Sequence, residues 1–293
     1  MARFYSIKNQ FLTGSARFRD LMYFGLKDRK MLSEEVEHTR LLALYKGQWA
    51  HLGDTNWSAA AMCVVKKPQE KLVVISDEGD VLTYAAGEKS NENIETQFSV
   101  IRNMSTIEGL AYACGMKREV FRRDAENTWV AMHAPTPEKG KNAGFEAISG
   151  FKSSEIYAVG WNGEIWRWDG EAWSQFDSPS DLILTGISCA PDGHVYICGQ
   201  HGTLIQGRNE RWETLDVGEF TRDLWDVRWF SGKLYLATMS ALWVYETGGL
   251  QPVDFGSDRP GTCYRLTDAE GILWSIGTDD VFSFDGTNWT RID

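Results

Sequence analysis

A five-residue β-like pattern recurs along the chain and constrains its fold more than any other feature. The pattern reads Ile-Tyr-Ala-Val-Gly at 156–160 and Val-Tyr-Ile-Cys-Gly at 195–199, and related pentads end at Gly115 and Gly277. Its second position falls at intervals of 39, 45, 39, 39 and 39 residues, at Val73, Tyr112, Tyr157, Tyr196, Tyr235 and Trp274. Self-similarity with a period of about 40 residues is typical of repeat folds such as propellers.

Each pentad belongs to a set of four β-like runs. A polar turn separates the pentad at 156–160 from a second run at 164–168, and the Asp169-Gly170 dipeptide then predicts a hairpin. A third run opens with Trp173, and a fourth run precedes each pentad, as at 185–189. Four short antiparallel strands in about 40 residues are the unit of a propeller blade.

The number of such units predicts an all-β fold, a single seven-bladed β-propeller with four antiparallel strands per blade. Seven runs of the same type begin near Leu41, Val81, Val120, Ile165, Leu204, Leu242 and Val281. The predicted blades span approximately 19–54, 55–98, 99–134, 143–177, 183–216, 222–255 and 261–293, after an N-terminal extension at 1–18. Because the run at 289–293 already supplies an outer strand, we expect the last blade to borrow no strand from the N-terminus.

The segment 155–173 reads Glu-Ile-Tyr-Ala-Val-Gly-Trp-Asn-Gly-Glu-Ile-Trp-Arg-Trp-Asp-Gly-Glu-Ala-Trp. It resembles the β-propeller repeats of bacterial proteins that are grouped loosely with WD40, YVTN and BNR-like repeats. The resemblance covers nearly the whole chain and implies a fold without a common activity. The sialidase Asp-box is absent, and the paired Gly-His and Trp-Asp signatures of WD40 blades do not recur.

Residues that form the repeat are expected to pack rather than to bind. Alternate positions of a strand face opposite sides, so the recurrent Tyr157 and its equivalents should fill the layer between neighbouring blades. A second group of charged residues falls on the predicted inner strands and would line the axial channel, where buried charges must pair: Arg102, Glu146, Asp226, Arg228 and Arg265.

Composition narrows the classes of partner. The chain has 30 basic and 41 acidic residues, a net charge of −11, which argues against nucleic acid or an anionic membrane as the main partner. No apolar stretch reaches the length of a membrane span, and no signal-peptide pattern precedes the repeats, so we expect a cytoplasmic protein. The five cysteines lack metal-ligand spacing and are expected to be buried free thiols.

Catalytic, cofactor and metal sites find no support in the sequence. The nucleophile elbow, the zinc-protease motif and the phosphate loop are all absent. The five histidines fall at different blade positions, and the carboxylates of blades two and seven are separated by blade one. We therefore predict no catalytic residue, no cofactor and no metal.

Residues that break the repeat are the better functional candidates. In a propeller, the loops after the second strand of each blade and the loops between blades lie at the same face. The predicted partner-binding residues on this face are Trp57, Trp161, His201, Met239, Asp77, Glu78, Asp279 and Asp280. Trp161 stands where the aligned residues are Gln200 and Thr278, so the repeat does not require an aromatic ring there. It is either an anchor for a partner or folds back onto its own blade.

Two functions remain after these exclusions. The first is a non-catalytic protein-binding propeller, and within it the more specific hypothesis is a bacterial immunity or antitoxin-like protein that masks a basic protein partner. The alternative is a glycan-binding or glycan-processing propeller, because aromatic rings with carboxylates and amides also suit sugars. A lectin would repeat its pocket in each blade, whereas these loops differ from blade to blade.

Overall fold

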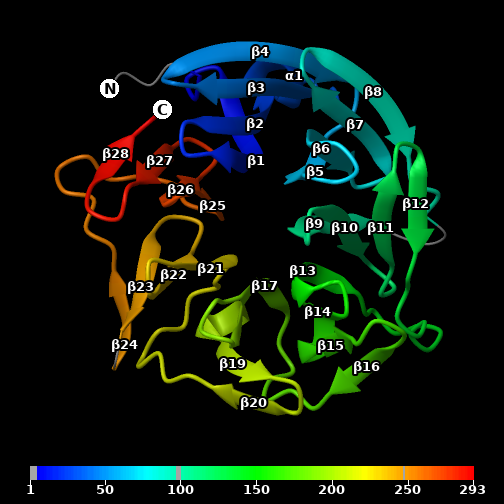
Figure 1. Cartoon of the computed structure of the whole chain (residues 1–293). Coiled ribbons are helices and arrows are strands. Elements are labelled where there is room, and N and C mark those ends of the chain that lie inside the picture. Colours follow the sequence, from blue (N-terminus) through cyan, green and yellow to red (C-terminus); the bar gives the residue numbers. More distant parts are fainter. Residues whose placement is uncertain (1–4, 97–99, 247) are drawn as a thin grey trace.

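A computed structural model describes residues 5–96, 100–246 and 248–293. Seven four-stranded antiparallel sheets are arranged in a ring around a central axis, as Figure 1 shows. Within each sheet the strands follow one another in chain order from the axis to the rim. The predicted all-β fold of seven blades with four strands each is therefore confirmed.

The strands fall into four classes by their distance from the axis. The inner strands are β1 (Asn9–Phe18), β5 (Ala59–Val65), β9 (Ile101–Ile107), β13 (Phe145–Lys152), β17 (Leu184–Cys189), β21 (Asp226–Phe230) and β25 (Arg265–Ala269). The second strands, which carry the recurrent pentad, are β2 (Leu21–Asp28), β6 (Lys71–Ser76), β10 (Leu110–Gly115), β14 (Glu155–Gly160), β18 (Val195–Gly199), β22 (Lys233–Ala237) and β26 (Ile272–Ile276).

The third strands start within two residues of the predicted positions. They are β3 (Thr39–Tyr45), β7 (Asp80–Ala85), β11 (Val120–Ala125), β15 (Ile165–Trp168), β19 (Leu204–Arg208), β23 (Leu242–Glu246) and β27 (Val281–Phe284). The outer strands are β4 (Gln48–Thr55), β8 (Glu88–Asn93), β12 (Thr128–Ala131), β16 (Trp173–Phe176), β20 (Arg211–Thr214), β24 (Gly249–Pro252) and β28 (Trp289–Arg291). In the described ranges, three short helices lie in loops: α1 (Arg29–Ser33), η1 (Trp161–Gly163) and η2 (Gln200–Gly202).

The N-terminal segment differs from the prediction. Residues 9–18 are not part of an extension but form β1, the inner strand of blade one, which pairs with β2. Phe11, Thr13 and Ser15 of this strand are buried. The sequence concealed the strand because its buried positions are partly polar. For the described residues, the prediction that blade seven borrows no N-terminal strand is confirmed, since its sheet consists of β25 to β28.

The apolar core lies between the blades, as the repeat predicted. Tyr157 of blade four packs with Ile187 and Ile197 of blade five, and Trp274 of blade seven packs with Phe24 of blade one. The glycine that ends the recurrent pentad is needed because the backbone of the preceding inter-blade loop passes close to it, and not because it forms a tight turn. A Cβ atom on Gly160 would lie 2.0 Å from the Gly144 carbonyl oxygen.

Ion pairs join neighbouring blades in addition to this apolar layer. Glu92 of β8 and Arg123 of β11 are almost completely buried and form a pair at 2.6 Å, and the Trp129 indole also donates to Glu92. Lining the axial channel, Arg102 lies 3.6 Å from Glu146 and Arg228 lies 2.5 Å from Asp268. The expectation that the charged residues named for the inner strands pair with one another is confirmed for Arg102 and Glu146, whereas Arg228 pairs with Asp268, which was not among them.

Candidate functional site

Two sets of loops meet at one end of the ring, which we call the loop face. It consists of the loops between second and third strands together with the loops that lead into the next inner strand. Backbone hydrogen bonds connect the two sets: the Trp161 amide donates to the Gly144 carbonyl, and the Cys263 amide donates to the Met239 carbonyl. The face is therefore a continuous surface built from all seven blades.

A hollow of about 1140 Å³ opens on the loop face beside the axis, mainly over blades one to three. Its lining includes Trp57, Asp77, Glu78, Arg102, Glu146 and Trp225. A smaller hollow of about 600 Å³ lies at the opposite end of the channel, where Arg17, Glu70 and Asp268 line it. The two ends of the axis thus differ in size and in the residues that they present.

Three of the eight predicted residues line the larger hollow. Trp57 is half-buried against the core between blades one and two, and its carbonyl accepts hydrogen bonds from the Thr39 and Thr55 hydroxyls. Asp77 and Glu78 directly follow β6 and are exposed. Neither carboxylate forms an ion pair with any residue that the structure describes.

Trp161 adjoins the same hollow without lining it. Its half-buried indole donates from Nε1 to Glu146 Oε1 at 2.6 Å, and Glu146 lines the hollow and pairs with Arg102. Because Glu146 belongs to the same blade, Trp161 is partly folded back, as the alternative interpretation held.

His201 and Met239 lie on the loop face but outside the hollow. The His201 amide donates to Asp223 across the loop, and its side chain is exposed. Met239 is 61% exposed at the tip of the loop between β22 and β23. The eight predicted residues therefore share a face without forming one cluster.

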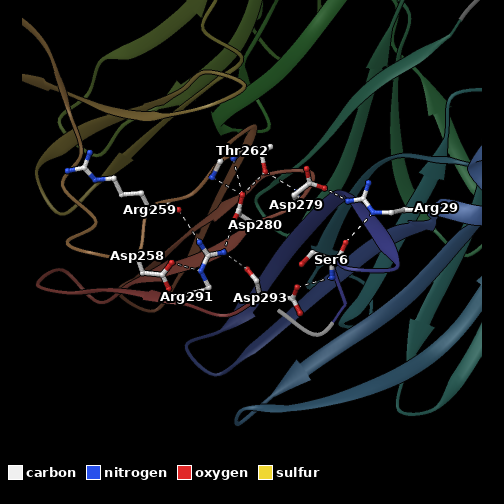
Figure 2. Close-up of polar contacts among 10 residues, drawn as sticks. Ser6, Arg29, Asp258, Arg259, Thr262, Asp279, Asp280, Arg291 and Asp293 are labelled. Atoms are coloured by element: carbon white, nitrogen blue, oxygen red, sulfur yellow. Dashed lines mark hydrogen bonds and ion pairs between the residues drawn. The ribbon is translucent and has the colours of Figure 1, made fainter. Parts of the chain in front are cut away.

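Asp279 and Asp280 take part in a polar network where blade seven meets blade one (Figure 2). Asp280 is only 1% exposed; it pairs with Arg291 at 2.5 Å and accepts hydrogen bonds from the Gly261 and Thr262 amides. Burial opposes ionisation, yet these hydrogen bonds outweigh it and lower the pKa of Asp280. The expectation that Asp280 presents charge at the surface is therefore wrong.

Other contacts in Figure 2 connect the two ends of the described chain. Asp279 pairs with Arg29 of blade one. The Asp293 carboxylate accepts hydrogen bonds from the Tyr5 and Ser6 amides at 2.7 and 2.8 Å. Asp279 and Asp293 thus help to close the ring, whereas the partners described above for Asp280 lie within blade seven. The sequence carried no signal of the ring-closing partners, because they lie up to 288 residues away.

The longest loop between a second and a third strand projects from blade one. Asp28 caps α1 by accepting from the Lys30 and Met31 amides. His38 is buried below the loop: its Nε2 accepts from the Asp28 amide, so its Nδ1 carries the proton that is donated to the Val36 carbonyl. This fixed loop presents exposed Leu32 and Val36.

Sequence reasoning missed the aromatic pair at the axial side of the hollow. Trp225 and Tyr264 precede β21 and β25 directly, and their ring centroids are 5.4 Å apart. The Arg265 guanidinium lies 4.8 Å from the Tyr264 ring centroid. An aromatic residue immediately before an inner strand is the signal that would have identified both rings.

The cysteines show no sign of reactive chemistry. All five are free, and burial raises the pKa of Cys63 to about 12 and that of Cys263 to about 11, so both remain protonated thiols at neutral pH. The described residues hold no group of three or more metal-ligating side chains. No helix in the described ranges is long and apolar enough to cross a membrane.

Similarity to solved structures identifies the class as seven-bladed β-propellers. A catalytically inactive variant of virginiamycin B lyase from Staphylococcus aureus, solved with quinupristin, gives a TM-score of 0.76 at 8% identity over 96% of each chain. The WD40 β-propeller domain of Doa1 gives 0.71 at 12% identity over 94% of this chain and 92% of that one. At these identities the similarity concerns the fold alone.

Sequence comparison is more specific. No family model matches the chain. The immune protein Tsi7 of Pseudomonas aeruginosa is 41% identical over an alignment 295 positions long, which covers 96% of each protein. The chain belongs to the family of the immune protein Tsi7.

Proposed function

We propose that this chain is an immunity protein that binds a protein toxin and neutralises it without catalysing a reaction. The observation that carries the proposal is the 41% identity to an immune protein over nearly the full length of both chains. A net charge of −11 supports a basic partner, because complementary charge accelerates association and disfavours wrong partners. We place this complex in the cytoplasm.

The loop face is the proposed binding surface. Of the exposed large apolar side chains in the described ranges, Ile7, Leu32, Val36, Val100 and Met239 lie on it, whereas Tyr45 and Val130 lie elsewhere. Apolar side chains surrounded by polar ones are typical of protein-interaction sites. The similarity to virginiamycin B lyase adds no argument for catalysis, since it is limited to the fold.

Protection of growing cells tests the proposal. Genes adjacent to the gene of this chain would be expressed one at a time in a heterologous bacterium, with and without the chain. We expect at least one product that stops growth when alone, permits growth when co-produced, and co-elutes with this chain in size-exclusion chromatography. Turnover of a glycan or lactone by the purified chain, or toxicity that persists despite complex formation, would contradict the proposal.

Substitutions of Trp161 test whether the loop face is the binding surface. Trp161→Ala should weaken toxin binding by about 2 kcal/mol, the size of an interface hot spot, while the melting temperature changes little. Trp161→Phe keeps an apolar ring and should retain most of the affinity. A sharp fall in melting temperature with unchanged affinity would instead make Trp161 a packing residue.

A further inference from the structure

Exposed apolar side chains gather beside the hollow of the loop face. Val100 is 39% exposed and lines it, and the exposed Val36 precedes Glu37, which also lines it. Trp57 contributes a half-buried ring to the same wall. These side chains give the hollow an apolar wall, in which Val100 and Val36 are exposed and Trp57 also packs against the core.

Two of the three cations that line the hollow lie beside carboxylates, and the third lies against an aromatic ring. Lys27 pairs with Glu37 at 3.0 Å, and Arg102 lies 3.6 Å from Glu146. Arg265 lies against the Tyr264 ring. Within the described ranges, Asp77 and Glu78 are left without a cation, so the hollow has uncompensated negative charge beside its apolar wall.

The size and the openness of the hollow suit a projecting segment of another protein. Its volume of about 1140 Å³ exceeds the range of roughly 300–1,000 Å³ that is usual for small-molecule pockets. It is also open to the loop face, where the blade-one loop and Val100 border it. A projecting loop of another protein can therefore place more than one side chain in it.

We propose that this hollow is the docking site for an arginine-bearing segment of the toxin. The inference rests on the proposed function and adds the place and the chemistry of contact. A long cationic side chain would lay its apolar stem and guanidinium against Trp57 and Val100. Its charge would lie at Asp77 and Glu78, whose carboxylates accept the fork-shaped donors of arginine.

Two double variants, each of which removes two negative charges, distinguish a local contact in the hollow from general electrostatic attraction of the toxin. Asp77→Asn with Glu78→Gln alters the hollow, and Asp181→Asn with Glu219→Gln alters exposed acids of the same face outside it. The probe is the toxin found in the protection experiment. We expect the hollow variant to raise Kd at least tenfold and to flatten the dependence of Kd on salt, and the control to change Kd less than threefold. Equal effects of both variants, or no effect of either, would overturn the proposal.

A matched pair of single variants tests the contribution of the apolar wall of the hollow to toxin binding. Val100→Ser in the hollow and Val130→Ser on β12 replace valines of nearly equal exposure, 39% and 38%. We expect only Val100→Ser to weaken toxin binding, by about threefold to tenfold. Circular dichroism and thermal melting of each variant confirm folding. Unchanged affinity for Val100→Ser places the toxin away from this wall and overturns the proposed docking geometry.

A second probe needs no toxin. A short synthetic peptide alternating glycine and arginine, with a glycine–glutamine peptide as control, is titrated while NMR follows the Trp57 indole signal. Only the arginine peptide should shift this signal, in the wild type and the control variant but not in the hollow variant. A shift that survives in the hollow variant, or no shift at all, overturns the inference. If the shift behaves as expected but no toxin is neutralised, the proposed function fails while the site remains.

Discussion

Two pairs of acidic residues lie in the same type of loop, between the second and third strands, of different blades and have opposite environments. Asp77 and Glu78 directly follow β6 in blade two, whereas Asp279 and Asp280 directly precede β27 in blade seven. In blade seven, Asp280 is buried against Arg291, and Asp279 pairs with Arg29 from the neighbouring blade. In blade two, both carboxylates face solvent. The charge of a loop in the sequence is thus no measure of the charge that it offers to a partner.

The difference has a simple energetic basis. A buried carboxylate loses its hydration and is tolerated only when hydrogen bonds and a cation replace the lost water. Asp280 therefore depends on its partners, and the fold depends on Asp280. An exposed carboxylate keeps its hydration and contributes little to stability. Substitution of Asp77 or Glu78 should consequently cost the fold little, so these positions are suited to binding a partner.

The largest effect is expected where blade seven meets β1. Phe11→Ala should lower the free energy of unfolding by about 3–5 kcal/mol, because Phe11 is 2% exposed and packs against Phe24 and Trp274. Ile7→Ala, at a 67% exposed position just before β1, should change it by less than about 0.5 kcal/mol. Chemical denaturation measures both. Equal, small effects would restore the interpretation of residues 1–18 as an extension.

The second prediction concerns the buried ion pair between Asp280 and Arg291 in blade seven. Asp280→Asn should destabilise the protein by about 3 kcal/mol, since Arg291 then keeps only Asp258, at 2.8 Å, as an acidic side-chain partner among the described residues. Asp279→Asn, in a half-exposed pair, should cost about 1 kcal/mol or less. Adding Arg291→Met to Asp280→Asn should recover part of the loss. A double variant no more stable than Asp280→Asn alone would contradict this account.

The third prediction concerns acid. Because the pKa of Asp280 is lower in the folded protein than its ordinary value of 3.8, its ionised form stabilises the fold above that pH. This stabilisation is lost as the pH falls through the lower folded-state pKa. Urea denaturation between about pH 5 and pH 2 should show that the free energy of unfolding falls less steeply with decreasing pH for Asp280→Asn than for the wild type. If the free energy of unfolding depends on pH equally in both proteins, Asp280 does not contribute to the loss of stability in acid.

The smallest effect on stability is expected at the exposed pair. Asp77→Asn with Glu78→Gln should alter the free energy of unfolding by less than about 0.5 kcal/mol. Any change should be a slight stabilisation, because two negative charges are removed from a chain of net charge −11. Thermal melting at low and high salt measures it. A loss of more than about 1 kcal/mol would make these residues structural and end the contrast with blade seven.

The blades were predictable because each repeats the same physical requirement. Tyr157, Tyr196 and Tyr235 return at one position because every blade must cover its neighbour with apolar surface. β1 escaped prediction because an inner strand faces the channel on one side and tolerates polar residues there. The face that carries Trp161, His201 and Met239 followed from the order of strands, whereas the partners of those residues did not.

The sequence by itself determined the all-β fold, the seven blades and the face on which the loops between strands meet. These features depend on patterns within about 40 residues, which periodicity records directly. Only the tertiary structure decided which acids are free, that Glu146 holds the Trp161 indole, and that a hollow opens over blades one to three. Those features depend on contacts between distant segments, and ring closure, which brings Asp293 to Tyr5, is what creates such contacts.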